Sequence, residues 1–254
     1  MSYKQIFYTS MLFVGLTLTS CNKAANPSVY QTDTTEIDAT FPVDEEIIDL
    51  IEPYKTQLDG AMNEVIGVFA HHMYKGDLPE GELGNFMSDA PKEVIEQKYQ
   101  EFLPIDFSMM NFGGIRVQEL PAGDVAMEDM YELMPFENEL VIVELAGTKM
   151  DSLLLRISQK GGIPISKNVN LVIENGNPRD FLVNAEPYDP NKTYRVLLTD
   201  YVANGGDGMD MLEDVPQSKT NLKLRDVLIE YMQLKSDRQE TVTARINGRI
   251  IVIN

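Results

Sequence analysis

Short apolar runs alternate with amphipathic stretches from residue 44 to the end of this 254-residue chain. Apolar residues at helical spacing predict helices over 44–58, 81–102, 148–162 and 221–234. Apolar or β-branched runs predict strands over 63–73, 106–111, 140–147, 169–174, 180–184 and 194–200, and a hairpin or final strand over 245–253. We expect Pro91 to break or restart the second helix. Strands and helices in this irregular order predict an α/β (α+β) fold, with sheets covered by helices.

The first twenty residues are typical of a secretion signal. Lys4 provides the positive start, residues 6–18 are mostly apolar, and "LTSC" at 18–21 ends the segment. The tetrapeptide resembles the bacterial lipobox, which predicts cleavage before Cys21 and acylation of its thiol. Alternatively, Cys21 is an ordinary cysteine within a signal peptide. It is the only cysteine in the chain, so an acylated Cys21 would leave no thiol for a disulfide.

Residues 22–43 are polar and show no apolar period, so the stretch 21–43 is predicted to be a lipidated cysteine followed by a tether. The folded domain is then expected over residues 44–254. These features predict a protein that is exported and lipid-anchored to a bacterial membrane, on its periplasmic face or at the cell surface.

The charge balance argues against nucleic acid as a partner. The chain has 21 Lys and Arg against 40 Asp and Glu, a formal net charge of −19. Such a surface repels polyanions at long range. A phosphate-bearing ligand would therefore need a local cationic group, and the first arginine in the chain is Arg116.

Three stretches share one form, in which a strand adjoins glycine, aromatic and polar residues. They are "NFGGIR" at 111–116, "MPFEN" at 134–138 and "YVANGGDG" at 201–208. The backbone N–H groups of glycines and a guanidinium are suited to binding an anion. Aromatic rings can stack on a base, and a carboxylate can accept hydrogen bonds from the hydroxyls of a ribose. The other interpretation is three ordinary turns with core aromatics.

The chain resembles the C-terminal domain of the secreted metallophosphoesterase 5'-nucleotidases over about residues 44–254. The stretches that carry the resemblance are "LGNFMSDA" (83–90), "NFGGIR" (111–116), "AGDVAMEDMYELMPFENELVIVELAG" (122–147) and "YRVLLTDYVANGGDG" (194–208). The resemblance implies a four-layer α/β/β/α sandwich that binds the nucleoside. In that family a separate N-terminal domain holds two divalent metals and cuts the phosphate ester.

The resemblance also implies a set of binding residues. The aromatic pair that clamps the base corresponds to Phe136 and Tyr201, the polar group that contacts the base to Asn138, and the ribose-binding carboxylate to Asp207. The phosphate-side loop corresponds to Asn111 and Arg116. We also expect the backbone of four glycines in these loops to lie close to the ligand, namely Gly113, Gly114, Gly205 and Gly206.

Two departures from the family pattern predict weaker binding of the phosphate group. The arginines that usually precede the "GN…DA" helix are missing, with only Lys75 nearby. Glu137 replaces the usual glycine of the base-binding loop, which should add bulk and negative charge close to the site.

The residues expected of a two-metal centre are also missing from the sequence. The chain has two histidines, His71 and His72, and on a strand adjacent side chains point to opposite faces. We therefore expect no catalytic residue, no metal site and no cofactor in this chain, and no hydrolysis by the chain alone.

Three functions remain open at this point. The chain could be the nucleoside- or nucleotide-binding half of a split 5'-nucleotidase, completed by a separate exported metallophosphatase that supplies two divalent metals. It could instead be a nucleoside-binding lipoprotein without catalysis. The third alternative is a structural or partner-docking domain with a vestigial pocket.

Overall fold

The computed structural model describes residues 44–253. The predicted signal peptide (1–20), Cys21 and the tether (21–43) lie outside the described residues. The chain divides into two compact units, with the boundary between Leu50 and Ile51. Among the helices described in residues 44–253, none combines the length and apolar character that a membrane span requires.

The first described element is the helix α2 (Glu45–Met62), which confirms the helix predicted at 44–58. Asp44 caps it, because the backbone N–H groups of Glu46 and Ile47 donate to Asp44 Oδ1 at 3.1 and 3.3 Å. Acidic residues in the first turn favour the positive end of the helix dipole. No residue of α2 is buried.

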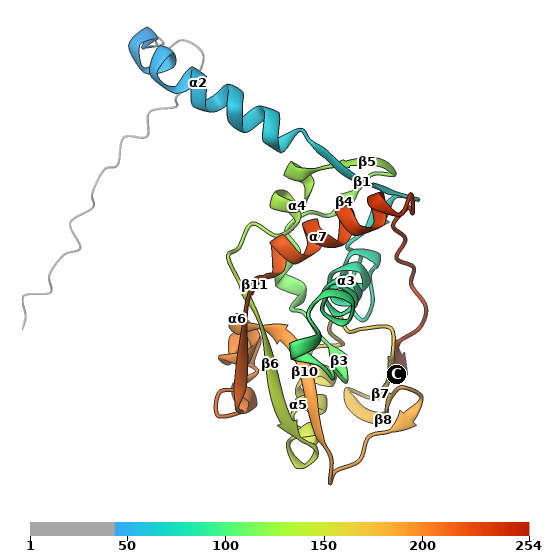
Figure 1. Ribbon diagram of the computed structural model, residues 1–254. Helices are drawn as coiled ribbons and strands as arrows, with labels where there is room; N and C mark the ends of the chain where they lie inside the picture. Colours follow the sequence, from blue (N-terminus) through green and yellow to red (C-terminus); the bar gives the residue numbers. More distant parts are fainter. Residues whose placement is uncertain (1–43, 254) are drawn as a thin grey trace, which may run out of the picture. The chain divides into compact units, whose positions relative to one another are not determined.

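A four-stranded sheet forms the centre of the second unit, in the order β11-β6-β10-β3 (Figure 1). Its strands are β3 (Phe107–Ser108), β6 (Glu139–Ala146), β10 (Thr193–Thr199) and β11 (Gln217–Lys223). Strand β6 is antiparallel to both β10 and β11, and β10 is parallel to β3.

A second four-stranded sheet has the order β12-β7-β8-β9. It contains β7 (Val169–Glu174), β8 (Asn177–Val183), β9 (Glu186–Pro187) and β12 (Ile250–Ile253). Strand β12 pairs in parallel with β7, so residues 245–253 end in a final strand. Two short antiparallel pairs complete the strands: β1 (Val65–Phe69) with β5 (Gly123–Ala126), and β2 (Met73–Tyr74) with β4 (Glu119–Leu120).

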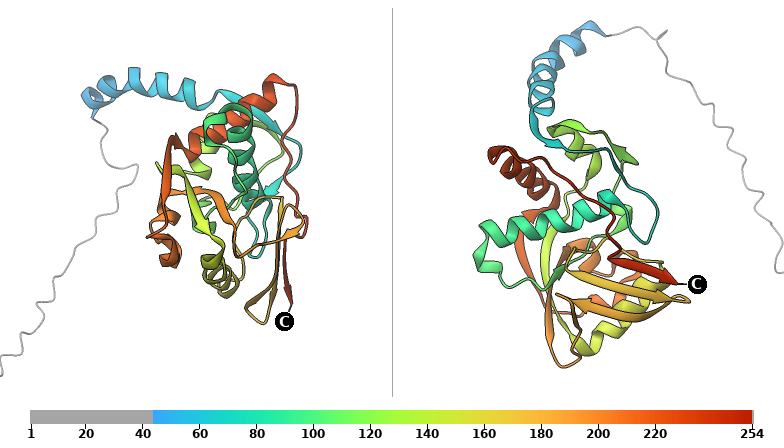
Figure 2. Two further views of the ribbon diagram at one scale, coloured as in Figure 1. Left: turned by 60° about the horizontal axis from the view of Figure 1, so that its bottom comes forward. Right: turned by 90° about the vertical axis from the view of Figure 1, so that its right-hand side faces the viewer.

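Two apolar cores lie on opposite faces of the central sheet. Because successive strand residues alternate sides, Ile142 packs into the first core and Val141 into the second. Helices α3 (Glu82–Lys98) and α7 (Leu224–Asp237) cover the first core, together with the short helix α4 (Met127–Leu133). Helix α5 (Gly147–Gln159) and the second sheet enclose the other core (Figure 2). The predicted mixed α/β class is confirmed.

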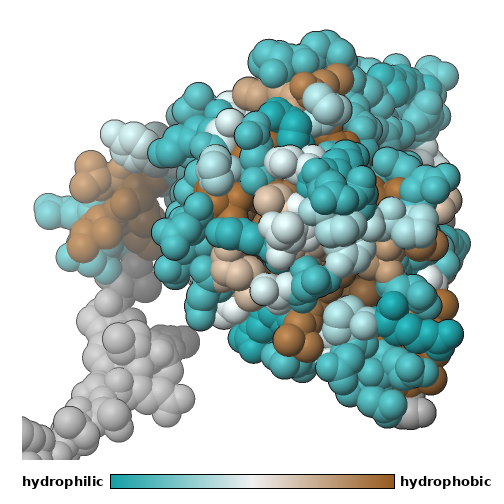
Figure 3. Space-filling model, turned by 90° about the horizontal axis from the view of Figure 1, so that it is seen from below, coloured by the Kyte–Doolittle hydropathy of each residue, from teal (hydrophilic) through white to brown (hydrophobic). Residues whose placement is uncertain are grey.

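Hydrophilic residues dominate the face that Figure 3 shows, with only isolated apolar patches between them. This agrees with the 24% of charged residues in the sequence.

Three details of the sequence prediction are wrong. Helix α3 continues through Pro91, because its buried side, including Phe86 and Val94, is held in the first core. The run 63–73 forms two strands separated by residues 70–72, so His71 and His72 lie in the connection and not on a strand. Strand β11 extends to Lys223, which delays the start of α7 to Leu224.

Candidate binding site

The pairing of the central sheet brings three distant loops to one end of it. In the β6–β10 ladder Leu140 pairs with Thr199, so the residues before β6 and those after β10 meet at the same end of the sheet. Strand β3 runs parallel to β10 and leads toward this end, where the short helix η2 (Phe112–Gly114) follows it.

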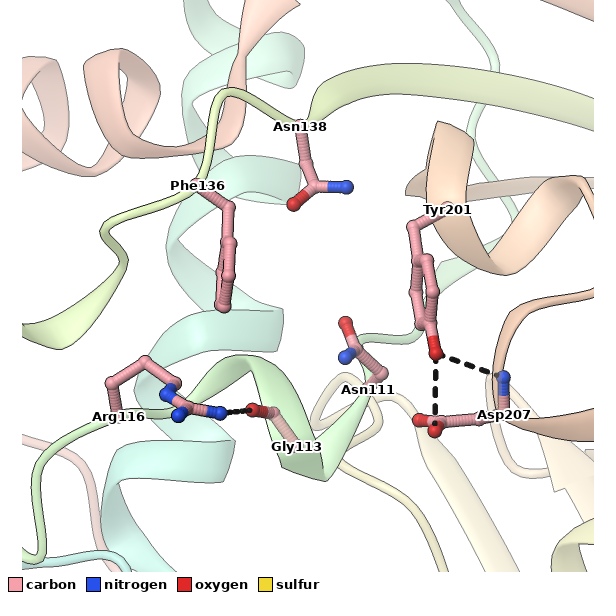
Figure 4. A pocket seen from close by; sticks show the side chains of 7 residues that line it. All are labelled: Asn111, Gly113, Arg116, Phe136, Asn138, Tyr201 and Asp207. Atoms are coloured by element: carbon pink, nitrogen blue, oxygen red, sulfur yellow. Dashed lines mark hydrogen bonds between the residues drawn. The ribbon is translucent and has the colours of Figure 1, made fainter. Parts of the chain in front are cut away.

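These loops enclose a cavity of about 320 Å³. Its lining is Asn111, Gly113, Arg116, Phe136, Asn138, Tyr201 and Asp207 (Figure 4). All seven belong to the set predicted from the sequence. Gly114, Gly205 and Gly206 lie outside the lining.

Two aromatic rings stand on opposite sides of the cavity (Figure 4). Phe136 comes from the loop between α4 and β6, and Tyr201 from the short helix α6 (Asp200–Ala203). The two residues are 41% and 45% exposed, unlike the aromatic residues of the two cores. A flat ligand between them could stack on both faces.

The glycines after Tyr201 shape the loop that carries Asp207. A Cβ on Gly206 would lie 2.6 Å from the Tyr201 ring and 2.4 Å from its carbonyl oxygen, so glycine is needed for this close approach. Gly205 has a positive φ of 84°, and Asp207 one of 58°. The Asp207 N–H donates to the Tyr201 hydroxyl at 3.2 Å, and that hydroxyl lies 3.5 Å from Asp207 Oδ1.

Two cations, Arg156 of α5 and Lys160 directly after this helix, fix the backbone of Asp207. Arg156 Nη2 and Lys160 Nζ donate to the Asp207 carbonyl at 3.1 and 2.9 Å. They hold a non-glycine residue in the left-handed region, a backbone state that surrounding contacts must maintain. Neither residue is predicted from the sequence, because nothing in the pattern of α5 indicates contact with a loop 47 to 51 residues away.

Asn111, Gly113 and Arg116 lie opposite Asn138 across the cavity in Figure 4. The Arg116 guanidinium donates to the Gly113 carbonyl at 3.4 Å and lies 5.6 Å from the centroid of the Phe136 ring. Gly114 is buried against the Asn111 side chain, where a Cβ would lie 3.0 Å from Oδ1. This side of the cavity is suited to an anion next to the aromatic clamp.

Arg225 of α7 supports the loop that carries Phe136. It is 5% exposed, and its Nη1 donates to the carbonyls of Met134 and Phe136, each at 3.4 Å. Its Nη2 pairs with Glu137, and its guanidinium stacks 4.1 Å from the Tyr131 ring. The role of Arg225 is not predicted from the sequence either.

Glu137 lies between the lining residues Phe136 and Asn138 in the sequence, and two cations compensate its charge. Glu137 is not part of the lining. Hydrogen bonds from Lys223 and Arg225 hold the pKa of its carboxyl at about 2, so it is ionised and paired.

Lys75 is not part of the cavity lining either. Its Nζ donates to the Ile115 carbonyl at 2.8 Å and lies 4.5 Å from the Phe112 ring centroid. Burial, followed by the charge of Arg116, lowers the pKa of Lys75.

The two histidines contact different groups. His71 Nε2 lies 2.9 Å from the Ala244 carbonyl and 3.5 Å from Glu82, whereas His72 Nε2 lies 3.2 Å from Glu119. Within residues 44–253, no group of three or more His, Cys, Asp or Glu side chains is arranged to hold a metal ion.

Comparison with known proteins places the chain in a family. Residues 65–214 match the family described as the C-terminal domain of 5'-nucleotidase. A 136-residue segment is 33% identical to the protein UshA of Escherichia coli, and it covers 52% of this chain and 24% of UshA. The match thus spans about a quarter of the length of that relative.

Two solved structures share the fold. The 5'-nucleotidase precursor of Thermus thermophilus superposes with a TM-score of 0.68 at 24% identity, over 84% of this chain and 44% of that one. The NAD nucleotidase of Haemophilus influenzae gives 0.63 at 22% identity, over 83% and 42%. At such identities the structures show the fold alone, and the match over residues 65–214 shows the family. The chain belongs to the family of 5'-nucleotidase C-terminal domains.

Proposed function

We propose that this domain binds a nucleoside or nucleoside 5'-monophosphate, as the substrate-binding half of a split 5'-nucleotidase that dephosphorylates nucleotides. The observation that carries the proposal is the pair of half-exposed rings, Phe136 and Tyr201, on opposite sides of a 320 Å³ cavity. A purine between them would gain about 1–3 kcal/mol from each stacking contact.

The remaining lining residues match the other parts of such a ligand. In the proposal, Asp207 accepts hydrogen bonds from the ribose hydroxyls, and Arg116 with Asn111 faces the phosphate. Gly113 lines the cavity. Gly114 keeps the phosphate-side loop compact, and Gly205 and Gly206 do the same for the loop of Asp207. Asn138 contacts the base.

The residues described here do not fit a two-metal hydrolytic centre, because the two histidines pair with separate carboxylates. In the proposal, a separately encoded exported metallophosphatase supplies two divalent metals and the hydrolytic chemistry. The present chain contributes binding and orientation. Acylation of Cys21 would hold it on the membrane that the partner faces, which raises their local concentration.

A non-catalytic nucleoside-binding lipoprotein is the second candidate. The observation that favours it is the charge of the lining, in which Arg116 is the one cation among the seven residues. Lys75 is engaged with Ile115 and Phe112 instead.

Titration calorimetry of the purified protein with adenosine and with AMP, in metal-free buffer, tests the binding function. Two stacked rings and one charged hydrogen bond predict affinities between about 1 μM and 1 mM. Phe136→Ala should weaken both ligands at least about tenfold. Tyr74→Ala is the matched control, because Tyr74 is an exposed aromatic outside the cavity. If the wild type and Phe136→Ala bind adenosine and AMP with equal affinity, the base is not held between Phe136 and Tyr201.

Hydrolysis of AMP by this protein mixed with a candidate exported metallophosphatase tests the split enzyme. We expect turnover only with both proteins present, loss of turnover with a metal chelator, and a raised KM with Phe136→Ala. If AMP binds but the mixture with Phe136→Ala hydrolyses AMP as wild type does, the second candidate function replaces the first.

A further inference from the structure

Asp200 joins two walls of the cavity through one oxygen atom. Its Oδ1 accepts hydrogen bonds from the backbone N–H of Tyr201 at 2.8 Å and of Glu139 at 3.2 Å. It also accepts one from the side-chain Nδ2 of Asn138 at 3.1 Å. The same carboxylate therefore fixes the start of α6, the start of β6 and the Asn138 amide.

This contact determines which end of the Asn138 amide faces the ligand. An ionised carboxylate only accepts hydrogen bonds, so Asn138 must present its NH₂ group to Asp200. Its carbonyl oxygen then points the other way. Figure 4 shows that oxygen directed into the space between Phe136 and Tyr201. None of the hydrogen bonds within residues 44–253 uses this oxygen as an acceptor.

We propose that Asp200 is a positioning residue that makes Asn138 a fixed hydrogen-bond acceptor, so that the site selects bases with an N–H donor at the facing edge. The exocyclic amino group of adenine is the simplest such donor. The inference rests on the proposed nucleoside binding and names the base chemistry that this site takes.

The selectivity follows from the cost of leaving the Asn138 oxygen without a donor. A base that carries only a C–H where adenine carries its amino group offers this oxygen no hydrogen bond, so the oxygen is desolvated and stays unsatisfied. Asn138 cannot correct this by rotating its amide, because rotation would turn its oxygen toward the Asp200 carboxylate. The donor-bearing base should therefore bind about tenfold more tightly.

Adenosine and purine riboside test this directly, because the second lacks only the exocyclic amino group. Calorimetry with the wild-type protein should give about a tenfold preference for adenosine. In Asp200→Ala the amide of Asn138 is free to turn its NH₂ toward the ring nitrogen of purine riboside. The preference should then fall to about twofold or less.

Asp200→Asn is the conservative variant. The N–H groups of Tyr201 and Glu139 still require an acceptor at the Oδ1 position, so the new amide oxygen should stay there. We expect this variant to keep the wild-type preference. Asn138→Ala should abolish it, and Asp210→Ala, which removes an exposed carboxylate outside the lining, should leave it unchanged.

The ratio of the two affinities separates positioning from damage to the fold. General damage in Asp200→Ala would weaken both nucleosides equally and leave the ratio at its wild-type value, which would overturn the inference. Equal affinities in the wild-type protein would overturn it while leaving nucleoside binding intact. If neither nucleoside binds the wild type, the proposed function itself fails and the inference with it.

Discussion

The ring of Tyr201 rests directly on Gly206, which explains why glycine occupies that position. A Cβ there would lie 2.4 Å from the Tyr201 carbonyl oxygen and 2.6 Å from its ring. Gly206→Ala should therefore displace the ring and weaken adenosine binding at least about tenfold, the loss expected for one stacking contact. Calorimetry gives the affinity. Thermal unfolding should also show about 1–3 kcal/mol of destabilisation from the overpacking.

The matched control for this variant is Gly60→Ala in α2. A Cβ on Gly60 would meet no atom within 4 Å, and the residue lies within a helix. The control should bind adenosine as wild type does. If Gly206→Ala binds adenosine equally well, Tyr201 does not need its present position to bind the ligand.

Residues that touch the cavity could be predicted, whereas residues that act through the backbone could not. Phe136 and Tyr201 stand next to turn residues after or before a strand, which is a local pattern. Arg156 and Arg225 act through carbonyl oxygens 51 and 89 residues away. Asp200 acts through the backbone N–H groups of Tyr201 and Glu139, and no local pattern indicates those contacts.

At the scale of elements, the contact between α3 and α7 predicts a pH dependence of stability. Tyr231 of α7 is buried, and its ring lies 5.9 Å from that of Phe86. Burial, with the charge of Glu93 as the next cause, raises the pKa of Tyr231 to about 12. The folded state thus favours the neutral phenol. This contribution is fully present below pH 10, the ordinary pKa of tyrosine, and is lost as the pH rises through about 12.

Tyr231→Phe removes this ionisation. The free energy of unfolding of the wild type should fall by about 2 kcal/mol more than that of the variant between pH 9 and pH 11.5. Urea unfolding at these pH values measures the difference. Tyr54→Phe, on the exposed ring of α2, corrects for removal of one phenol. Parallel pH curves for wild type and Tyr231→Phe would contradict the prediction.

The elements themselves were predictable where their burial is regular. Strand β6 is almost continuously apolar because both of its faces meet a core. Strand β11 was missed because Thr220 is its one buried residue, and the stretch "QSKTNLK" carries no apolar period. Helix α3 shows the opposite case, since packing of its buried side overrides the local signal of Pro91.

For the whole molecule, strand pairing assembles the site from parts about 60 residues apart along the chain. Leu140 and Thr199 are partners in the β6–β10 ladder, so Asn138 and Tyr201 meet two residues beyond them. Such a register is not readable from a single sequence. The family resemblance supplied it indirectly, because it assigns both positions to one nucleoside-binding site.

The net charge of the whole chain predicts how salt should affect the capture of a nucleotide. With a formal charge of −19, the protein repels an approaching AMP dianion over distances comparable to the Debye length. That length falls from about 30 Å at 0.01 M salt to about 8 Å at 0.15 M. The attraction of Arg116, which acts at contact distance, is screened much less than this long-range repulsion.

The association rate of AMP should therefore rise at least about threefold when the salt concentration is raised from about 0.01 M to about 0.15 M. The rate for uncharged adenosine should stay within about twofold and serves as the internal control. Stopped-flow measurement of the tyrosine fluorescence change on binding gives both rates. An AMP rate that falls with salt would mean that the cations around the cavity outweigh the acidic surface. The AMP would then be steered toward Arg116, and the site would favour nucleotides over nucleosides despite the charge of the whole chain.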